Sequence, residues 1–525
     1  MPVWNVVRRS CYQDSLMLMR VSYELESVPG IQRAAAMMGT PQNRALLADA
    51  GLLTSEGEAA SPHDLILAVI TDDPATVQAA YTAADTALTP QRPASTSGMP
   101  LLPYRPRTLA SALNRLPGTN LALISVPGQY AAAEAWKALR AGLHVMLFSD
   151  HVPVEAEIEL KRFALAQGLW LMGPDCGTAI IEGAPLGFAN DVPRGRIGIA
   201  AASGTGLQEV ACLIAAAGEG ISQAIGVGGR DLSEEVGGLM MDQALAALAT
   251  DPGTVVICVI GKPPGPSVAQ HLQARVAQLG KPCVVYYMGI APTPPGTWYA
   301  ATTLEDAAGA AVALARGMPP MPTEFTAPPD EIAQLVEKVT RPMQPSQRFV
   351  RGIYSGGTLA YEAIALLHTR LAAVELDVTG SGGGHRVIDL GEDRFTVGRP
   401  HPMLDGRARR EWILREGRDP ATAVLLLDVL LGYGAHPNPA GEILPPIRAV
   451  QQEAVATGRH LAIVASVCGT DQDPQGRPAQ VAALRSQGVL VMPSNAQASR
   501  LAALIAVRLA GGEFRGSSRP GAAHR

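Results

Sequence analysis

Nearly uninterrupted runs of apolar residues recur between helix-like segments over most of this chain. Three of them lie near residues 197–202, 255–260 and 423–431. A strand whose side chains are apolar on both faces must be covered on both faces, which is typical of a parallel sheet between helices. The alternation of such strands with helices therefore predicts the α/β class, with parallel sheets, for residues 107–512.

The chain has 525 residues, too many for one hydrophobic core, so several domains are expected. Strands near 3–9, 31–38 and 65–70, with helices between them, indicate a small ferredoxin-like or ACT-like module at 1–90. The other expected parts are a Rossmann-like domain at 107–190, two similar α/β domains at 195–317 and 345–512, and a disordered tail at 513–525. Proline-rich linkers are expected at 89–106 and 318–330.

Composition narrows the classes of function. The net charge is −5 with both signs interspersed, so neither nucleic acid nor an acidic membrane is an expected partner. None of the six cysteines forms a C-x-x-C pair or another metal-ligand spacing, so no metal site is expected. We expect the cysteines to be buried thiols in a reducing compartment. No apolar run approaches the roughly 20 residues that a membrane span needs. The N-terminus lacks the apolar core of a signal peptide, and we expect a cytoplasmic protein.

Two segments, 197–209 and 350–362, end an apolar strand with Ser-Gly and then begin a helix. Free backbone N–H groups at a helix start, with only small side chains around them, form an anion site. The candidate anion- or substrate-binding residues are Ser203, Gly204, Thr205 and Gly206 in the first turn and Ser355, Gly356, Gly357 and Thr358 in the second. The alternative is an ordinary tight turn between strand and helix. No Lys follows either turn, so a P-loop is not expected.

The two domains at 195–317 and 345–512 read as repeats of one another. Besides the two Ser-Gly turns, Val227-Gly228-Gly229-Arg230 corresponds to Val397-Gly398-Arg399-Pro400, and the run from Asp251 corresponds to the run from Asp419. Three correspondences in one order indicate a duplication. Arg230, which follows a strand of the first repeat, is a further candidate for anion binding.

The densest polar cluster is GRPHPMLD, residues 398–405. Arg399 can bind a phosphate or carboxylate through two hydrogen bonds, and His401 can act as acid, base or hydrogen-bond donor. These two are the candidate catalytic residues. The alternative is a proline-bracketed loop in which His401 is merely exposed.

Two more segments carry polar residues beside strands. Asp428 lies inside an apolar strand, where a charge is costly unless it is paired, and His436 follows in the next loop. Both are candidate site residues, although His436 also fits a solvated loop. The glycine-rich segment 377–385 either bends sharply toward a ligand or is a surface loop.

Several of these motifs resemble a known family. GPDCGT from Gly173, RIGIAAASGTGLQE from Arg196 and GVGGRD from Gly226 resemble the α subunit of succinyl-CoA synthetase. SGGTLAYEA from Ser355 is similar to that family's Ser-Gly-Thr-Leu-x-Tyr-Glu-Ala helix start. Over nearly its full length, including GRPHPMLD and SNAQA from Ser494, the chain resembles the FdrA family, whose members are commonly labelled acyl-CoA synthetases.

The resemblance implies a CoA-binding-type domain at 107–190 and two flavodoxin-type synthetase domains at 195–317 and 345–512. It suggests coenzyme A as a ligand, although the residues themselves name no cofactor. It also implies a phosphohistidine between two facing helix starts, but the matching stretch 288–308 contains no His, and Lys262 stands near the position of the family's orienting Glu. The chain also has no room for an ATP-grasp domain. These departures weaken ATP-driven CoA ligation.

The FdrA resemblance implies a subunit of an oxamate carbamoyltransferase complex in purine or allantoin catabolism. Such a complex converts oxamate and carbamoyl phosphate to oxalurate and phosphate, or the reverse. Arg399 and His401 would stabilise the oxyanion while the two Ser-Gly turns hold the anions. The expected partners are these small anions and further subunits. The alternatives are a subunit of an ADP-forming acyl-CoA synthetase and a non-catalytic scaffold that binds CoA or an anion.

Overall fold

The computed structural model describes residues 2–13, 15–88, 106–288, 298–376, 384–396 and 400–512. The chain divides into two compact units, one formed by residues 1–117 with 398–400, and one by 118–397 with 401–525. The expected linker 89–105, most of the 377–385 segment and the expected disordered tail lie outside the described residues. The expected domain boundaries within the second unit stay predictions, because the contacts divide the chain only once.

The first unit is a small α/β module whose strands pair in the order β1-β3-β2, all antiparallel. Its elements are β1 (Val3–Arg8), α1 (Ser15–Glu26), β2 (Arg33–Met38), α2 (Pro41–Asp49), α3 (Ser55–Glu58), β3 (Leu65–Ile70), α4 (Pro74–Leu88) and α5 (Leu109–Arg115). The central strand β3 is apolar throughout because both of its faces are covered: Leu65, Leu67 and Val69 pack with α1 and α4, and Ile66 and Ala68 pack on the other side. The ferredoxin-like prediction is confirmed.

The second unit begins with a three-stranded parallel sheet, β4-β5-β6, followed by a seven-stranded sheet ordered β13-β12-β11-β9-β10-β7-β8. The first comprises β4 (Leu121–Ile124), α6 (Gly128–Arg140), β5 (His144–Leu147), α7 (Val154–Ala166) and β6 (Leu171–Met172). The second comprises β7 (Thr178–Ile181), β8 (Ala184–Gly187), β9 (Arg194–Ala202), α8 (Gly204–Ala216), β10 (Ile221–Gly226), α9 (Leu239–Thr250), β11 (Val256–Gly261), α10 (Pro266–Val276), β12 (Cys283–Tyr287), β13 (Tyr299–Ala300) and α11 (Leu304–Ala315). The antiparallel hairpin β7–β8 was not predicted. Its turn has positive φ at Glu182 and Gly183, and Glu-Gly is not among the usual signals for that turn.

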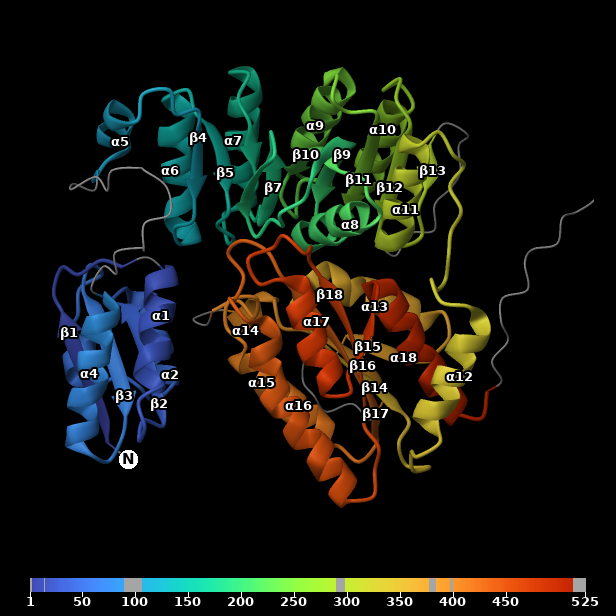
Figure 1. The fold of residues 1–525 in the computed structure, drawn as a ribbon. Coiled ribbons are helices and arrows are strands. Elements are labelled where there is room, and N and C mark those ends of the chain that lie inside the picture. The colour runs from blue at the N-terminus through green and yellow to red at the C-terminus, as the bar shows by residue number, and fades with distance from the viewer. Residues whose placement is uncertain are drawn as a thin grey trace, which may run out of the picture. The chain divides into compact units, whose positions relative to one another are not determined.

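The last sheet is six-stranded and entirely parallel, in the order β15-β16-β14-β17-β18-β19. Its elements are α12 (Pro329–Thr340), β14 (Phe349–Tyr354), α13 (Gly357–His368), β15 (Val374–Leu376), β16 (His385–Asp389), α14 (Asp393–Thr396), α15 (Arg407–Arg418), β17 (Thr422–Leu430), α16 (Pro439–Ala456), β18 (Ala462–Cys468), α17 (Arg477–Ser486), β19 (Leu490–Met492) and α18 (Asn495–Leu509). Helix α12 begins at the end of the expected second linker. Strand β16 was not predicted, because it has only five residues and directly follows a glycine run that favours a loop. The α/β architecture with parallel sheets is confirmed (Figure 1).

The two large sheets confirm the duplication. The order β10-β9-β11-β12-β13 in one matches β16-β14-β17-β18-β19 in the other, and a Ser-Gly helix start follows the equivalent strand in each. One predicted correspondence is wrong: the residues after β10, Val227–Arg230, correspond to those after β16, residues 390–393, and not to 397–400. Residues 397–400, VGRP, resemble Val227–Arg230 in sequence only, and the order of the strands shows which segments are equivalent.

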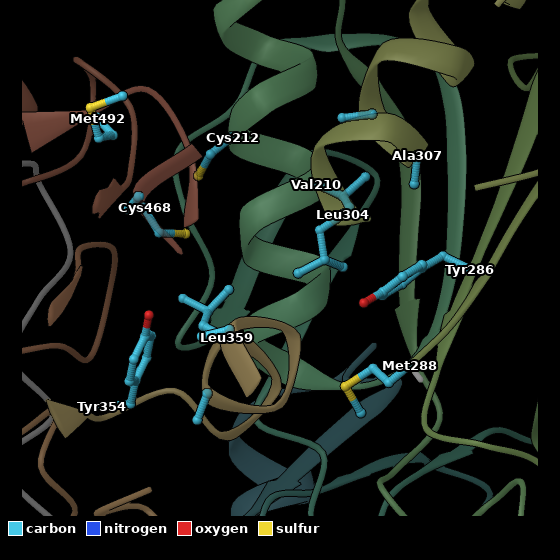
Figure 2. Close-up of a cluster of buried hydrophobic side chains, with 14 of the residues drawn as sticks. Val210, Cys212, Tyr286, Met288, Leu304, Ala307, Tyr354, Leu359, Cys468 and Met492 are labelled. Carbon is cyan, nitrogen blue, oxygen red and sulfur yellow. The ribbon is translucent and has the colours of Figure 1, made fainter. Parts of the chain in front are cut away.

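Helices α8, α11, α13 and α18 lie between the two repeats. Figure 2 shows part of this core, with Val210 and Cys212 on α8, Leu304 on α11, and Leu359 on α13. α8 packs on α11 and α13 packs on α18, and the two pairs contact one another. One continuous core therefore joins the repeats and fixes where their helices begin.

Two buried glutamates cap helices of the opposite repeat. Glu209 of α8 accepts the N–H of Asn495, the first residue of α18, at 3.0 Å. Glu362 of α13 accepts the N–H of Leu304, the first residue of α11, at 2.7 Å, and the Asn495 amide at 2.8 Å. Burial raises the pKa of both carboxyls, that of Glu362 to about 7. Each such hydrogen bond contributes about 0.5–1.5 kcal/mol, and because both glutamates bond a helix of the other repeat, they hold the repeats in register.

Candidate functional site

The two Ser-Gly helix starts lie against one another. The Ser203 hydroxyl and the Thr358 hydroxyl are 2.5 Å apart, so one hydrogen bond joins the start of α8 to the start of α13. Gly356 faces Thr205 so closely that a Cβ on Gly356 would lie 3.1 Å from the Thr205 methyl. The structure therefore brings the two predicted turns together at one place between the repeats.

The start of α8 is open. Ser203 is the N-cap, and its hydroxyl accepts the Gly206 N–H at 3.0 Å. Within the described ranges, the N–H groups of Gly204 and Thr205 make no hydrogen bond. A Cβ on Gly206 would lie 2.6 Å from the Ser203 oxygen, so glycine is required there. Two unpaired N–H groups at the positive end of a helix dipole suit a bound anion.

The turn before α13 is different because Asp428 binds its N–H groups, whereas within the described ranges the N–H groups of Gly357 and Thr358, the first two residues of α13, make no hydrogen bond. The Asp428 carboxylate accepts the N–H of Ser355 at 2.9 Å, the N–H of Gly356 at 2.7 Å and the Ser355 hydroxyl at 3.1 Å. Buried Arg409 donates to Asp428 Oδ1 at 3.1 Å and to the Asp428 carbonyl at 2.5 Å. The expectation that Ser355 and Gly356 bind substrate through their N–H groups is thus not met in this structure. The prediction that Asp428 would be paired is correct.

A second carboxylate, Asp389, lies at the carboxyl end of β16 beside the start of α13. Its Oδ1 accepts the N–H of Gly391 at 2.9 Å. Its Oδ2 approaches Gly357 so closely that a Cβ there would lie 2.6 Å away. Asp389 is 5% exposed, and burial raises its pKa to about 6, with Asp428 and Glu392 adding to the shift and Lys262 opposing it.

His401 lies at the same place. A Cβ on Gly391 would be 2.9 Å from His401 Nε2 and 3.1 Å from both Asp389 Oδ1 and the Ser355 carbonyl, so these groups enclose Gly391. His401 Nδ1 accepts the Met403 N–H at 3.2 Å. Burial lowers the pKa of His401 to about 4, although the Asp150 charge opposes this. The imidazole is therefore neutral at physiological pH, with its proton on Nε2, and can donate a hydrogen bond there.

Ser355 also lines a small pocket. Ser355, Arg409, His436 and Glu442 supply its polar lining, and most of the remaining lining residues are apolar. His436 Nδ1 accepts the Asn438 N–H at 3.1 Å, and its Nε2 lies 3.9 Å from Glu442. The predicted pair Asp428 and His436 is thus brought to one region through Arg409 and Ser355.

The remaining predicted residues lie apart or outside the described part. Arg230 donates to the Val152 carbonyl at 2.6 Å and pairs with Glu157 at 2.9 Å, so its guanidinium is already engaged. It thereby joins a buried network in which Lys161 bonds both Glu157 and Asp231 at 2.7 Å. Arg399 lies outside the described residues.

Sequence reasoning missed Asp389 and Arg409. Asp389 ends β16, a short strand with the sequence HRVID that was not predicted, so the rule that ligands lie beyond strand ends could not be applied to it. Arg409 is one of three arginines near the start of α15, and the sequence offers no reason to choose it. Only the fold shows that its side chain is buried against Asp428.

Known proteins are similar in sequence to all or to parts of this chain. The protein YahF of Escherichia coli K12 is 38% identical over 515 residues, which cover 96% of this chain and 98% of YahF. The chain belongs to the YahF family. YahF itself is described as uncharacterised, so membership brings no activity with it.

Matches to narrower regions give the chemical class. A family model described as CoA-ligase matches residues 353–505, which include the start of α13, Asp389 and Asp428. The α subunit of ADP-forming succinate–CoA ligase is 29% identical over 182 residues in Methanothermobacter thermautotrophicus and 32% over 185 in Aquifex aeolicus. Each alignment covers 34% of this chain and 59% of the ligase subunit. This YahF-family member is therefore acyl-CoA synthetase-like, and it spans about three-fifths of those subunits.

Solved structures resemble the chain more weakly. ATP citrate lyase of Methanothrix soehngenii, solved with citrate and coenzyme A, is 14% identical with a TM-score of 0.35, over 80% of this chain and 88% of the lyase. Acetyl-coenzyme A synthetase 1 of Ca. Korarchaeum cryptofilum is 16% identical with a TM-score of 0.31, over 75% of this chain and 84% of the synthetase. Scores this low establish no correspondence between residues.

A model described as the heavy metal-associated domain of AllF matches residues 1–100. Soft metal ions are held by pairs of thiolates, but Cys11 is the one cysteine of this segment, and it accepts a hydrogen bond from Gln13 at 3.6 Å. Across the described ranges, no three His, Cys, Asp or Glu side chains gather as a metal site would need. The residues of the module therefore do not fit a thiolate metal site. Of the helices in the described ranges, none has both the length and the apolarity to span a bilayer.

Proposed function

We propose that this chain is a group-transfer subunit of the acyl-CoA synthetase class and binds an acyl phosphate where α8 and α13 meet. The observation that carries the proposal is the asymmetry of the two helix starts. Gly204 and Thr205 of α8 offer unpaired N–H groups, while two carboxylates lie at the other start, Asp428 in the turn before α13 and Asp389 beside Gly357. The phosphate group is expected at α8, and the carbonyl group that leaves it would then face α13.

The roles of the surrounding groups follow from their charges. A neutral His401 with its proton on Nε2 can donate to the carbonyl oxygen as negative charge develops there. Asp428 and Arg409 hold the start of α13 rigid without taking part in the reaction. Coenzyme A as acceptor is supported by the CoA-ligase match and by the similarity to succinate–CoA ligase α subunits.

A matched pair of variants tests the anion site. Proline is tolerated at the first position of a helix and has no N–H, so Gly204→Pro removes one donor, whereas Gly204→Ala retains it. With the full chain and its co-purifying subunits, turnover of acetyl phosphate with coenzyme A should fall roughly 100-fold in Gly204→Pro, the loss typical of one oxyanion donor. Gly204→Ala should stay close to wild type. Equal activity of the two variants contradicts a phosphate at α8.

Carbamoyl transfer between carbamoyl phosphate and oxamate is the second candidate, and it would make the chain an FdrA-type subunit. Carbamoyl phosphate is itself an acyl phosphate, and the sequence 288–308 contains no His to store a phosphoryl group, which favours direct transfer. Arg399 would share the stabilisation of the oxyanion with His401. Turnover of carbamoyl phosphate that depends on oxamate, and not on CoA, decides for this candidate. Binding of CoA or sulfate without any turnover would instead indicate a scaffold.

Location and partners are part of the same proposal. All six cysteines are unpaired thiols, five of them buried, which supports a reducing, cytoplasmic location. We expect further subunits, and purification of the tagged chain from its own cells identifies them.

A further inference from the structure

Asp389 is a buried carboxylate whose contacts within the site leave one oxygen unused. Its side chain is 95% buried, yet within the described ranges only Oδ1 has a hydrogen-bond partner, the Gly391 N–H. Oδ2 makes none there and lies beside Gly357, the first residue of α13. A carboxylate that is only 5% exposed and has one oxygen without a protein donor is costly to keep ionised, so its retention points to a role in the site.

The surroundings of Oδ2 connect it with the open start of α8. Gly357 lies between Gly356, which faces the Thr205 methyl, and Thr358, whose hydroxyl bonds Ser203. His401 Nε2 and Asp389 Oδ1 flank Gly391 from the same side. Asp389 therefore lies beside the first residue of α13, and the next residue of α13 bonds the start of α8.

We infer that Asp389 is the general base of this site, which takes the proton of the acceptor through Oδ2. The inference rests on the proposed transfer from an acyl phosphate. In that step the acceptor sulfur or nitrogen forms a bond to the carbonyl carbon, and the carbon–oxygen bond to phosphate breaks. Phosphate leaves with the electron pair, and the acceptor proton passes to Asp389 Oδ2 and then to solvent.

The environment gives Asp389 and His401 opposite protonation behaviour. Burial and the charges of Asp428 and Glu392 raise the pKa of Asp389 to about 6, and the charge of Lys262 opposes this. Burial lowers the pKa of His401 to about 4, so its imidazole is neutral above that pH. Groups whose pKa values are driven apart in this way are typical of acid and base roles. Between pH 5 and 8, Asp389 is the group of this pair that changes charge.

The kinetic test uses the full complex with the acyl phosphate and acceptor that the wild type turns over. Asp389→Asn keeps the shape and the bond from Gly391 but not the basicity, and it should lower kcat/KM by about 100-fold or more. The wild-type kcat/KM should fall tenfold per pH unit below pH 6, and that of Asp389→Asn should not. Glu392→Gln removes a neighbouring charge and should stay within about twofold of wild type. Asp389→Asn with wild-type kcat/KM and pH profile overturns the inference, whereas a wild type without turnover of any acyl phosphate overturns the proposed function.

A binding measurement separates a base from a purely structural carboxylate and needs no turnover. Sulfate, whose charge is constant from pH 5 to 8, probes the anion site by calorimetry on the full chain. Wild type should bind sulfate about threefold or more tightly at pH 5 than at pH 8, because Asp389 loses its charge, and Asp389→Asn should bind tightly at both. Equal pH dependence in the two proteins overturns the placement of Asp389 beside the anion. If Asp389→Asn does not fold, Asp389→Glu is used in both assays. Its pH midpoint should differ from that of the wild type, and an unchanged midpoint would contradict the inference.

Discussion

Removing the Asp428 carboxylate should loosen the start of α13 and leave a hole that a small carboxylate can refill. Asp428→Ala deletes the acceptor of the Ser355 and Gly356 N–H groups and leaves Arg409, which is 3% exposed, without its ion-pair partner. Breaking a buried pair from one side costs about 3–5 kcal/mol, and each unsatisfied buried N–H costs about 1–3 kcal/mol. These contributions overlap because the same relaxation relieves both, so we expect about 4–5 kcal/mol in total.

Hydrogen exchange followed by mass spectrometry measures this cost locally, which suits a chain of several domains whose unfolding is not a single transition. About 4 kcal/mol corresponds to roughly a 1,000-fold loss of protection in the peptide 350–362. Asp471→Asn, at an exposed aspartate, is the control and should leave that peptide unchanged. Formate at about 100 mM should restore much of the protection in Asp428→Ala, because it supplies a carboxylate to Arg409 and both N–H groups. Unchanged protection in Asp428→Ala would refute the reasoning that this carboxylate holds the turn before α13.

Three further predictions concern other charged groups. His401→Ala should reduce turnover about 100-fold without moving the pH midpoint near 6, since His401 is neutral over that range; a displaced midpoint would show that the imidazole titrates there. Because the folded state raises the Glu362 pKa from 4.5 to about 7, the folded chain keeps a proton that the unfolded chain has lost, so stability should fall as pH rises from about 5 to 7. Glu209 and Asp389 contribute in the same direction, so Glu362→Gln should reduce this slope in the hydrogen-exchange protection of α11, and an unchanged slope contradicts the prediction. Lys161→Met leaves buried Asp231 without its ion-pair partner and Glu157 with Arg230 alone, and local stability measured by hydrogen exchange should fall by about 3–5 kcal/mol. Lys137→Met at the surface should cost under about 1 kcal/mol, and similar losses would contradict the buried network.

The sequence predicted the strands whose two faces are both apolar. β9, β11 and β17 are buried almost throughout, and their position follows from composition alone. β16 and the hairpin β7–β8 are short, and tertiary pairing rather than propensity forms them. The same limit explains the mistaken match of Val397–Pro400 to Val227–Arg230, since only strand order distinguishes equivalent positions from similar letters.

The sequence predicted most residues of the candidate site, but not which of their charged groups pair with one another. The Ser-Gly turns, Asp428, His401 and His436 stand out as residues and all lie in the second compact unit. That Asp428 closes one turn, and that Arg409 holds it there, depends on a β17 side chain meeting the α13 start across the sheet. No local pattern carries this information, because Asp428 lies 73 positions after Ser355 and 19 after Arg409.

A single position accounts for the asymmetry between the repeats. In the first repeat Ala202, directly before the Ser-Gly turn, pairs with Gly261 of β11. In the second, Tyr354 stands directly before the turn, and continuing the pairing of Ile353 with Leu427 by one residue brings Tyr354 opposite Asp428. Glycine at 261 has no side chain to reach the α8 start, and a Cβ there would lie 2.4 Å from the Leu232 side chain. One repeat therefore has a carboxylate, Asp428, at the turn before its helix, and the other has a glycine at the equivalent position. The proposed anion at α8 would supply there the negative charge that Asp428 supplies in the second repeat.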